Sequence, residues 1–200
     1  MPDFTAINNL RLKSLYASEE KFSQVQSDVD FLTELFEVEN RGLVFVWDDK
    51  SKEHSTYVSD TKGIGSNRIL KVINKNHVDT FLWHIDGVMF KRGTKCDCAL
   101  LNNSILCFVE FKSEAKNNSA AQASFEYEKA EAQVETILTD LLSRCASAGF
   151  DITKQITIKG MAVFNRTVPR YNASQKAAVR KFEKAFNNKF KFEFENEIEV

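Results

Sequence analysis

Two acidic side chains and one lysine lie on two apolar segments of the sequence that a short polar turn separates. Asp97 comes early in the first segment, and Glu110 and Lys112 end the second. Side chains alternate between the two faces of a strand, so Glu110 and Lys112 share one face. A hairpin closed through Asn102 and Asn103, or a slightly longer turn, brings Asp97 opposite or diagonal to Glu110, about 5–8 Å away. Two acids and an amine then converge at one place.

The remaining residues of the two segments predict that one face of the hairpin is entirely apolar. Alternation puts Asp97 on one face with Lys95, Ala99 and Leu101, and it leaves the other face fully apolar, with Cys96, Cys98, Leu100, Cys107, Val109 and Phe111. Folding alone gains nothing from carboxylates beside such a surface, which favours a chemical role for Asp97 and Glu110.

The chemistry that these residues favour is metal-dependent hydrolysis. Two neighbouring carboxylates repel each other, and burying either one costs several kcal/mol unless a cation compensates. Mg²⁺ or Mn²⁺ fits this need, because both ions prefer oxygen ligands and bind through one or two carboxylates with waters and phosphate oxygens. We expect Asp97, Glu110 and the backbone carbonyl of Phe111 as metal ligands. Lys112 would orient a water molecule or stabilise charge in the transition state.

A purely structural explanation remains open at this point. Acidic residues two positions before a lysine are common in a chain with 28% charged residues. A cross-strand acid–lysine pair on an edge strand contributes only a few tenths of a kcal/mol.

The pattern of Asp97, a hairpin, and Glu110-Phe111-Lys112 at the end of an apolar strand resembles the PD-(D/E)xK nuclease superfamily. That superfamily includes restriction-type endonucleases and Holliday-junction resolvases. The resemblance covers residues 80–165, and Cys96 stands where many members have proline.

The resemblance implies a fold and two further site residues. The implied fold is α/β, with a mixed central β-sheet flanked by helices and a restriction-endonuclease-like αβββαβ core with N- and C-terminal elaborations. Some members add a glutamate on the helix before the sheet and a glutamine on the helix after it. Glu34 and Gln133 are the nearest candidates here.

The function expected from this resemblance is a Mg²⁺- or Mn²⁺-dependent nuclease that hydrolyses phosphodiester bonds. DNA is favoured over RNA as the substrate, and endonuclease over exonuclease action. Restriction, phage defence or repair is the expected context, by association with the fold alone. The alternative is a nucleic-acid-binding or assembly subunit that keeps the fold without catalysis. A homodimer or a partner protein would help to supply specificity, since the chain has little room for a separate sequence-reading domain.

A strongly basic stretch near the C-terminus indicates where nucleic acid would bind. From Ile152 to Lys191 the sequence has ten basic residues and one acid, Glu183, a local balance of +9 in a chain whose net charge is −1. Such a block attracts phosphate backbones, although a solvated helix face is the alternative. The expected contacts, which include three residues beside the catalytic hairpin, are Lys91, Arg92, Lys95, Arg166, Arg170, Arg180, Lys181 and Lys184.

Length and composition bound the remaining possibilities. Two hundred residues with 43% hydrophobic content predict one globular nuclease-like domain over residues 1–200, with a core at about 80–165 and a basic helix and strand at 166–200. The sequence has neither a long uncharged apolar stretch nor a signal peptide, so we expect a cytoplasmic protein without membrane contact.

The cysteines and histidines do not predict a metal site. The thiols of Cys96, Cys98, Cys107 and Cys145 are expected to be buried and reduced, because no histidine lies at zinc-ligand spacing. The three histidines are scattered along the sequence, and His84 is expected to be an ordinary strand residue.

Hydrophobic periodicity predicts the elements that position these residues. We expect helices at 24–39, 66–76, 120–147 and 174–186. The first would begin with a capping box at Ser27 and Asp30, and the second would be capped by Ser66. Besides the two strands of the hairpin, we expect strands at 43–47, 54–58, 80–90, 155–164 and 189–195.

Overall fold

The computed structural model describes residues 4–19, 28–64, 69–90, 93–112, 120–164 and 172–200. The helices are α1 (Thr5–Asn9), α2 (Leu12–Leu15), α4 (Asp28–Leu35), α5 (Ala120–Ser147) and α6 (Ala173–Ala185), with a short 3-10 helix at Ile152–Lys154. The strands are β1 (Phe36–Glu39), β2 (Leu43–Asp49), β3 (His54–Val58), β4 (Ile69–Ile73), β5 (Thr80–His84), β6 (Cys98–Leu101), β7 (Ile105–Lys112), β8 (Thr157–Phe164), β9 (Lys191–Glu193) and β10 (Glu197–Glu199).

The strands form two mixed sheets. The larger sheet has six strands in the order β1-β5-β6-β7-β8-β9. In it, β5, β6 and β7 form an antiparallel meander, α5 follows β7, and β8 then returns parallel to β7. The smaller sheet has the order β10-β4-β2-β3. The architecture is therefore mixed α/β, as expected.

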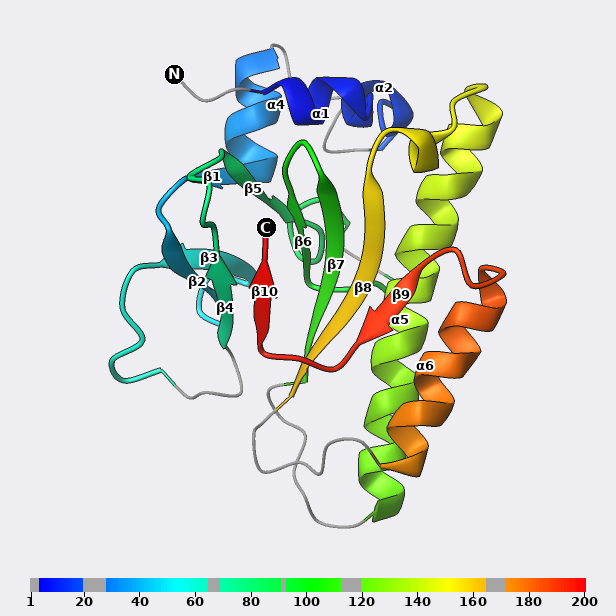
Figure 1. Cartoon of the computed structure of the whole chain (residues 1–200). Coiled ribbons are helices and arrows are strands. Elements are labelled where there is room, and N and C mark those ends of the chain that lie inside the picture. Colours follow the sequence, from blue (N-terminus) through cyan, green and yellow to red (C-terminus); the bar gives the residue numbers. More distant parts are fainter. Residues whose placement is uncertain (1–3, 20–27, 65–68, 91–92, 113–119, 165–171) are drawn as a thin grey trace.

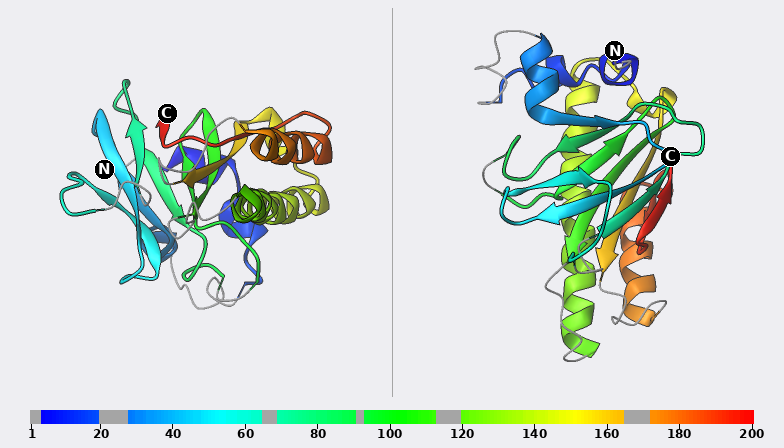
Figure 2. Two further views of the ribbon diagram at one scale, coloured as in Figure 1. Left: turned by 90° about the horizontal axis from the view of Figure 1, so that it is seen from below. Right: turned by 90° about the vertical axis from the view of Figure 1, so that its left-hand side faces the viewer.

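The molecule has three layers, with the larger sheet in the middle. Figure 1 shows α5 and α6 side by side on one side of this sheet, and Figure 2 shows the smaller sheet on the other side. The helices α1, α2 and α4 lie at one end of the layers (Figure 1).

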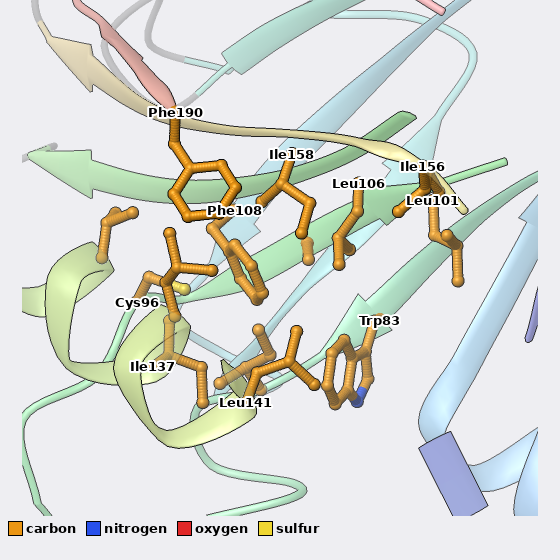
Figure 3. Close-up of a cluster of buried hydrophobic side chains, with 14 of the residues drawn as sticks. Trp83, Cys96, Leu101, Leu106, Phe108, Ile137, Leu141, Ile156, Ile158 and Phe190 are labelled. Carbon is orange, nitrogen blue, oxygen red and sulfur yellow. The ribbon is translucent and has the colours of Figure 1, made fainter. Parts of the chain in front are cut away.

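Helix α5 covers the larger sheet because it carries one apolar stripe. The stripe predicted from the sequence is fully buried and comprises Ala130, Val134, Ile137, Leu138, Leu141 and Cys145. Figure 3 shows Ile137 and Leu141 pointing toward the sheet, where Trp83, Leu106 and Phe108 lie. Burial of each large aliphatic side chain stabilises the fold by about 1.5–3 kcal/mol.

A second apolar core joins the two sheets. Residues of β2, β4 and β10 pack against the opposite face of the larger sheet, where Leu82, Cys98, Leu100, Cys107, Val109 and Phe111 lie. The face predicted to be apolar is therefore buried. Cys96 is also buried, but it precedes β6 and packs on the other face, in the core under α5.

Gly160 allows side chains of α5 and β9 to pack closely against β8. A Cβ atom at this position would lie 2.7 Å from both Phe192 Cδ2 and Val134 Cγ1. Those side chains come from β9 and from α5, so the absence of a side chain at Gly160 sets how closely the two elements pack on β8.

Several predicted elements are confirmed with small shifts at their ends. The helix at 120–147 is α5, and the helix at 174–186 is α6. The strands predicted at 43–47, 54–58 and 155–164 are β2, β3 and β8.

Two predicted helices are wrong in part or in full. The helix expected at 24–39 ends at Leu35, and Phe36–Glu39 pairs antiparallel with β5 as strand β1. The helix expected at 66–76 is replaced by strand β4. Its β-branched and aliphatic side chains pack in the inter-sheet core, and ladders to β2 and β10 satisfy its backbone. Ser27 and Ser66, the expected caps, lie outside the described residues.

Two predicted strands are shorter than expected. The strand at 80–90 ends at His84, and a turn follows in which Gly87 has a positive φ of 73°. The strand at 189–195 is reduced to β9, which pairs with β8, and the following strand β10, which pairs with β4, was not predicted. Phe190 and Phe192 point inward as predicted, whereas Phe194 is only partly buried. Strands β2 and β3 pair as an antiparallel hairpin, which belongs to the smaller sheet.

Candidate active site

Glu110 and Lys112 lie on a strand that is paired on both sides. Strand β7 is flanked by β6 and β8, and the exposed fractions of Glu110 and Lys112 are only 3% and 6%. An edge strand with solvated charge pairs, the structural alternative, is therefore wrong. Two ionisable side chains are buried inside the larger sheet, where charge is costly.

The hairpin brings Asp97 to Glu110 as predicted. Cys98 pairs with Val109 at the start of β6, so the same register extended by one residue sets Asp97 opposite Glu110. A turn at Asn102 closes the hairpin, with the side-chain oxygen of Asn102 accepting hydrogen bonds from the backbone of Ser104 and Ile105. Asp97 Oδ2 accepts a hydrogen bond from the backbone N–H of Phe111 at 2.5 Å. Asp97 is thus held against the C-terminal end of β7.

Lys112 connects the strand to helix α5. Its Nζ donates to Glu110 Oε1 at 2.6 Å and also donates to Gln133 Oε1. Gln133 Nε2 in turn donates to the backbone carbonyl of Lys95 at 2.9 Å. Gln133, which the family resemblance proposed, therefore lies beside Lys112 and fixes the direction of its amine.

The two carboxyl groups lie in an environment that disfavours negative charge. Burial raises the pKa of Asp97 well above its usual range, and the neighbouring charge of Glu110 raises it further. Burial also raises the pKa of Glu110 to about 7, although Lys112 acts in the opposite direction. One lysine does not offset the loss of water around two acids.

Glu110 has one oxygen that the fold leaves unsatisfied. Glu110 Oε2 is buried and has no hydrogen-bond partner among the described residues. Leaving a buried acceptor unpaired costs about 1–3 kcal/mol or more when it is charged. A divalent cation would satisfy this oxygen and lower both shifted pKa values, and the surrounding donors are oxygens that Mg²⁺ or Mn²⁺ accepts.

Two further acids act on this site and were missed from the sequence. The charges of Asp86 and Asp48 both raise the pKa of Glu110, and Asp48 also raises that of Asp97. Asp86 follows β5 and Asp48 lies on β2 of the smaller sheet. The only signal in the sequence is that each acid comes at the end of an apolar strand segment.

The remaining predicted catalytic residue, Glu34, is exposed on α4. The described contacts that assemble the site come from β6, β7 and α5. Asp97, Glu110, Lys112 and Gln133 therefore converge, and the role of Glu34 stays a prediction.

The predicted nucleic-acid contacts divide into three groups. Lys91, Arg92, Arg166 and Arg170 lie outside the described residues. Lys95 is buried, with its Nζ 4.8 Å from the centre of the Phe90 ring, rather than on the open surface. Arg180, Lys181 and Lys184 are exposed on α6.

Acidic residues neutralise part of the basic block. Lys181 pairs at 2.6 Å with Glu131, which is fully buried on α5. Lys191 pairs with Glu183, and Lys159 pairs with Glu193, each at 2.9 Å. Among the described residues, no acid lies within ion-pair distance of Lys176, Arg180 or Lys184, so these exposed cations of α6 are not neutralised by an ion pair.

The prediction for the cysteines is confirmed, whereas two of the histidines lie together in the fold. All four cysteines are free and buried, as predicted. The histidines are not scattered in space, because the rings of His54 and His84 stack with their centroids 4.5 Å apart. Residues 30 positions apart meet there because β3 packs against β5, which sequence spacing does not reveal.

Comparison with known proteins adds no assignment. The chain matches no protein-family model, no curated protein and no solved structure. Within the described residues, every helix is too short or too polar to cross a membrane.

Proposed function

We propose that this chain is a divalent-metal-dependent nuclease whose active site comprises Asp97, Glu110, Lys112 and Gln133. The observation that carries the proposal is the buried carboxylate of Glu110, which lies opposite Asp97. One of its oxygens accepts a hydrogen bond from Lys112, and the other has no partner among the described residues. A structural ion pair would need no second acid at this point, and the second acid raises the cost of both charges.

The proposed metal ligands are Asp97, Glu110 and the backbone carbonyl of Phe111. The N–H of Phe111 points to Asp97, and in a strand the N–H and C=O of one residue point to the same side. This geometry supports the carbonyl as a ligand on the Asp97 side of β7. Mg²⁺ or Mn²⁺ bound there would supply a Lewis acid for a phosphate oxygen and a source of activated water.

The proposed role of Lys112 is to hold positive charge where negative charge develops on phosphate. Gln133 orients its amine, and the backbone of Lys95 orients Gln133 in turn. Preorganised charge of this kind is typically worth about 3–4 kcal/mol in a transition state. Burial of the amine beside Glu110 keeps it in place before substrate arrives.

The chain order around the site supports the proposed restriction-endonuclease-like core. Strands β5, β6 and β7 come first, α5 follows, and β8 returns parallel to β7. The acid pair and the lysine lie toward the C-terminal end of β7, the end at which α5 begins (Figure 1).

Nucleic acid is the proposed substrate, with DNA favoured. Helix α6 begins beside the N-terminal half of α5, where Asn172 Nδ2 donates to the hydroxyl of Tyr127 at 3.2 Å. Lys176, Arg180 and Lys184 follow along α6 and would contact the phosphate backbone without reading bases.

The test is a digestion panel with the purified chain and Mg²⁺ or Mn²⁺. Supercoiled DNA, linear DNA, single-stranded DNA and RNA are incubated with the wild type, with Asp97→Asn and with Asp60→Asn. Asp60 is exposed and also lies two residues before a lysine, so it is a matched control. We expect Asp97→Asn to abolish metal-dependent cleavage and Asp60→Asn to leave it unchanged.

Two results would contradict the proposal. Full metal-dependent cleavage by Asp97→Asn would place the active site elsewhere. Binding of nucleic acid by the wild type without cleavage of any substrate in the panel would favour the non-catalytic subunit instead.

A further inference from the structure

A second cluster of metal-binding side chains lies between the two sheets. Glu37 on β1, His54 on β3 and His84 on β5 each offer one donor atom within 4.8 Å of the other two. His84 Nε2 lies 3.6 Å from Glu37 Oε1. The rings of His54 and His84 are stacked, with an angle of 22° between their planes.

The cluster lies on the opposite face of the larger sheet from Glu110. His84 pairs with Cys98 and Glu37 pairs with Leu82, so both side chains share the face that the smaller sheet covers. Glu110 shares its face with Phe108, which packs in the core under α5. The two sites are therefore distinct.

Neighbouring groups hold the Glu37 carboxylate in place before any ion arrives. Thr56 Oγ1 donates to Glu37 Oε1 at 2.8 Å, and the backbone N–H of Tyr57 donates to Glu37 Oε2 at 2.9 Å. These contacts orient the carboxylate in the way that outer hydrogen bonds orient metal ligands. They also attach β3 to β1, since Thr56 and Tyr57 belong to β3.

The two imidazoles have unsatisfied nitrogens. His54 Nδ1 and His84 Nδ1 are buried without a hydrogen-bond partner among the described residues. Each imidazole therefore keeps a nitrogen available as a donor, and the neutral imidazole is the form that binds metal.

We propose that Glu37, His54 and His84 form a site for a divalent transition metal of the Zn²⁺ class, which joins β3 of the smaller sheet to β1 and β5 of the larger sheet. Imidazole nitrogens favour Zn²⁺ over Mg²⁺, and two histidines with one glutamate are an established donor set for zinc. Bonds of about 2.0–2.2 Å would require donor atoms that lie within 4.8 Å of one another to close in by about 1 Å.

The ion would stabilise the packing of the two sheets. A ligand that binds only the folded chain raises its stability with concentration, so bound Zn²⁺ should raise the melting temperature. The turn before β3 already contacts the turn after β5, because a Cβ on Gly87 would lie 2.3 Å from the carbonyl oxygen of Glu53. Metal binding would fix an existing contact rather than create a new one.

The test is calorimetric titration of the chelator-treated full chain with Zn²⁺, with Co²⁺ absorption as a second measurement. The variants are His54→Asn, the matched control His77→Asn, and Asp97→Asn. His77 is exposed and lies outside the cluster. We expect one high-affinity Zn²⁺ site in the wild type, in His77→Asn and in Asp97→Asn. Affinity should fall roughly 100-fold or more in His54→Asn, with loss of the visible Co²⁺ band.

Further variants separate the two metal sites. Glu37→Gln keeps an acceptor for Thr56 and Tyr57, and it replaces His54→Asn if circular dichroism shows that variant to be unfolded. No Zn²⁺ binding by the wild type at micromolar concentration, or wild-type affinity in both cluster variants, would overturn the site. Loss of Zn²⁺ binding in Asp97→Asn alone would move the ion to the carboxylate site and equally overturn it.

Discussion

The amine of Lys112 lies 2.6 Å from Glu110 Oε1, two residues earlier on the same face of an internal strand. This pair is the centre of the site, yet it is incomplete, because Glu110 Oε2 is buried and unpartnered among the described residues. A structural ion pair in the interior normally has its remaining lone pairs satisfied. Substitutions at the pair and around it test what the incomplete pair is for.

Glu110→Gln should change how stability depends on pH in the metal-free chain. The folded pKa of Glu110 is raised from 4.5 to about 7, so the folded state binds more protons than the unfolded state between these values. Stability should therefore fall as pH rises through this window, by an amount on the order of 3 kcal/mol at most. Thermal melts of the wild type and Glu110→Gln in chelator, from pH 4.5 to 8, measure the difference.

Comparison of the two proteins cancels the groups that titrate independently of Glu110, whereas the pKa of Asp97 responds to the charge of Glu110 and changes with it. The lowered pKa of His84 has the opposite effect between about 4 and 6.5, and both proteins retain it. Parallel curves for the wild type and Glu110→Gln would show that Glu110 does not titrate in this range.

Lys112→Met should separate catalysis from metal binding, if the proposed nuclease function holds. Methionine retains most of the apolar stem and removes the amine, so Mg²⁺ affinity measured by calorimetry should change only slightly. Turnover should fall by roughly 100- to 1,000-fold, because the variant has no preorganised charge at the reacting phosphate. Loss of metal binding with unchanged turnover at saturating Mg²⁺ would argue against this role.

If the proposed nuclease function holds, Gln133→Leu should lower kcat more than it raises KM, because the contacts of Gln133 fit a residue that positions Lys112. The variant removes the acceptor for Lys112 Nζ and the donor to the carbonyl of Lys95. A loss of about tenfold is expected, with Gln133→Glu restoring part of it by again accepting from Lys112. Equal activity of the leucine and glutamate variants would exclude a positioning role.

Combined replacement of Lys176, Arg180 and Lys184 by glutamine should weaken nucleic-acid binding about equally across sequences. Log affinity should depend less on log salt, by about 0.9 for each duplex phosphate that the variant no longer neutralises. Lys181 is left intact because its removal would strand the buried Glu131. Replacement of Lys13, Lys62 and Lys75, which are exposed outside the basic block, changes net charge by the same amount and is the control. Equal effects of the two triple variants would mean that α6 is only a solvated face.

Gly160→Ala should destabilise the fold by about 1–3 kcal/mol through overpacking. The new methyl group would lie 2.7 Å from Val134 Cγ1 and from Phe192 Cδ2. The double variant Gly160→Ala, Val134→Ala makes room on the α5 side, so a double-mutant cycle in urea should show a favourable coupling. Additive effects would place the strain elsewhere.

Local patterns in the sequence were enough to predict how the site is arranged along the hairpin. Strand alternation and a two-asparagine turn were enough to predict that Asp97 meets Glu110 and that Lys112 shares a face with it. A long apolar stripe was enough to define α5 at Ala120–Ser147. These features depend on neighbours within a few residues or on one hairpin, where the period of the backbone fixes which side chains meet.

Which surfaces become internal and which distant residues meet depends on long-range packing, which local patterns do not reveal. The smaller sheet covers the face of the hairpin that carries Cys98 and Cys107. The segment at 69–73, predicted to be helical, joins that sheet as strand β4. The smaller sheet also brings Asp48 close enough for its charge to act on Glu110. The same packing stacks His54 on His84. Such contacts depend on burial against elements far along the chain, and burial overrides the local preference of a short apolar segment because it contributes more free energy.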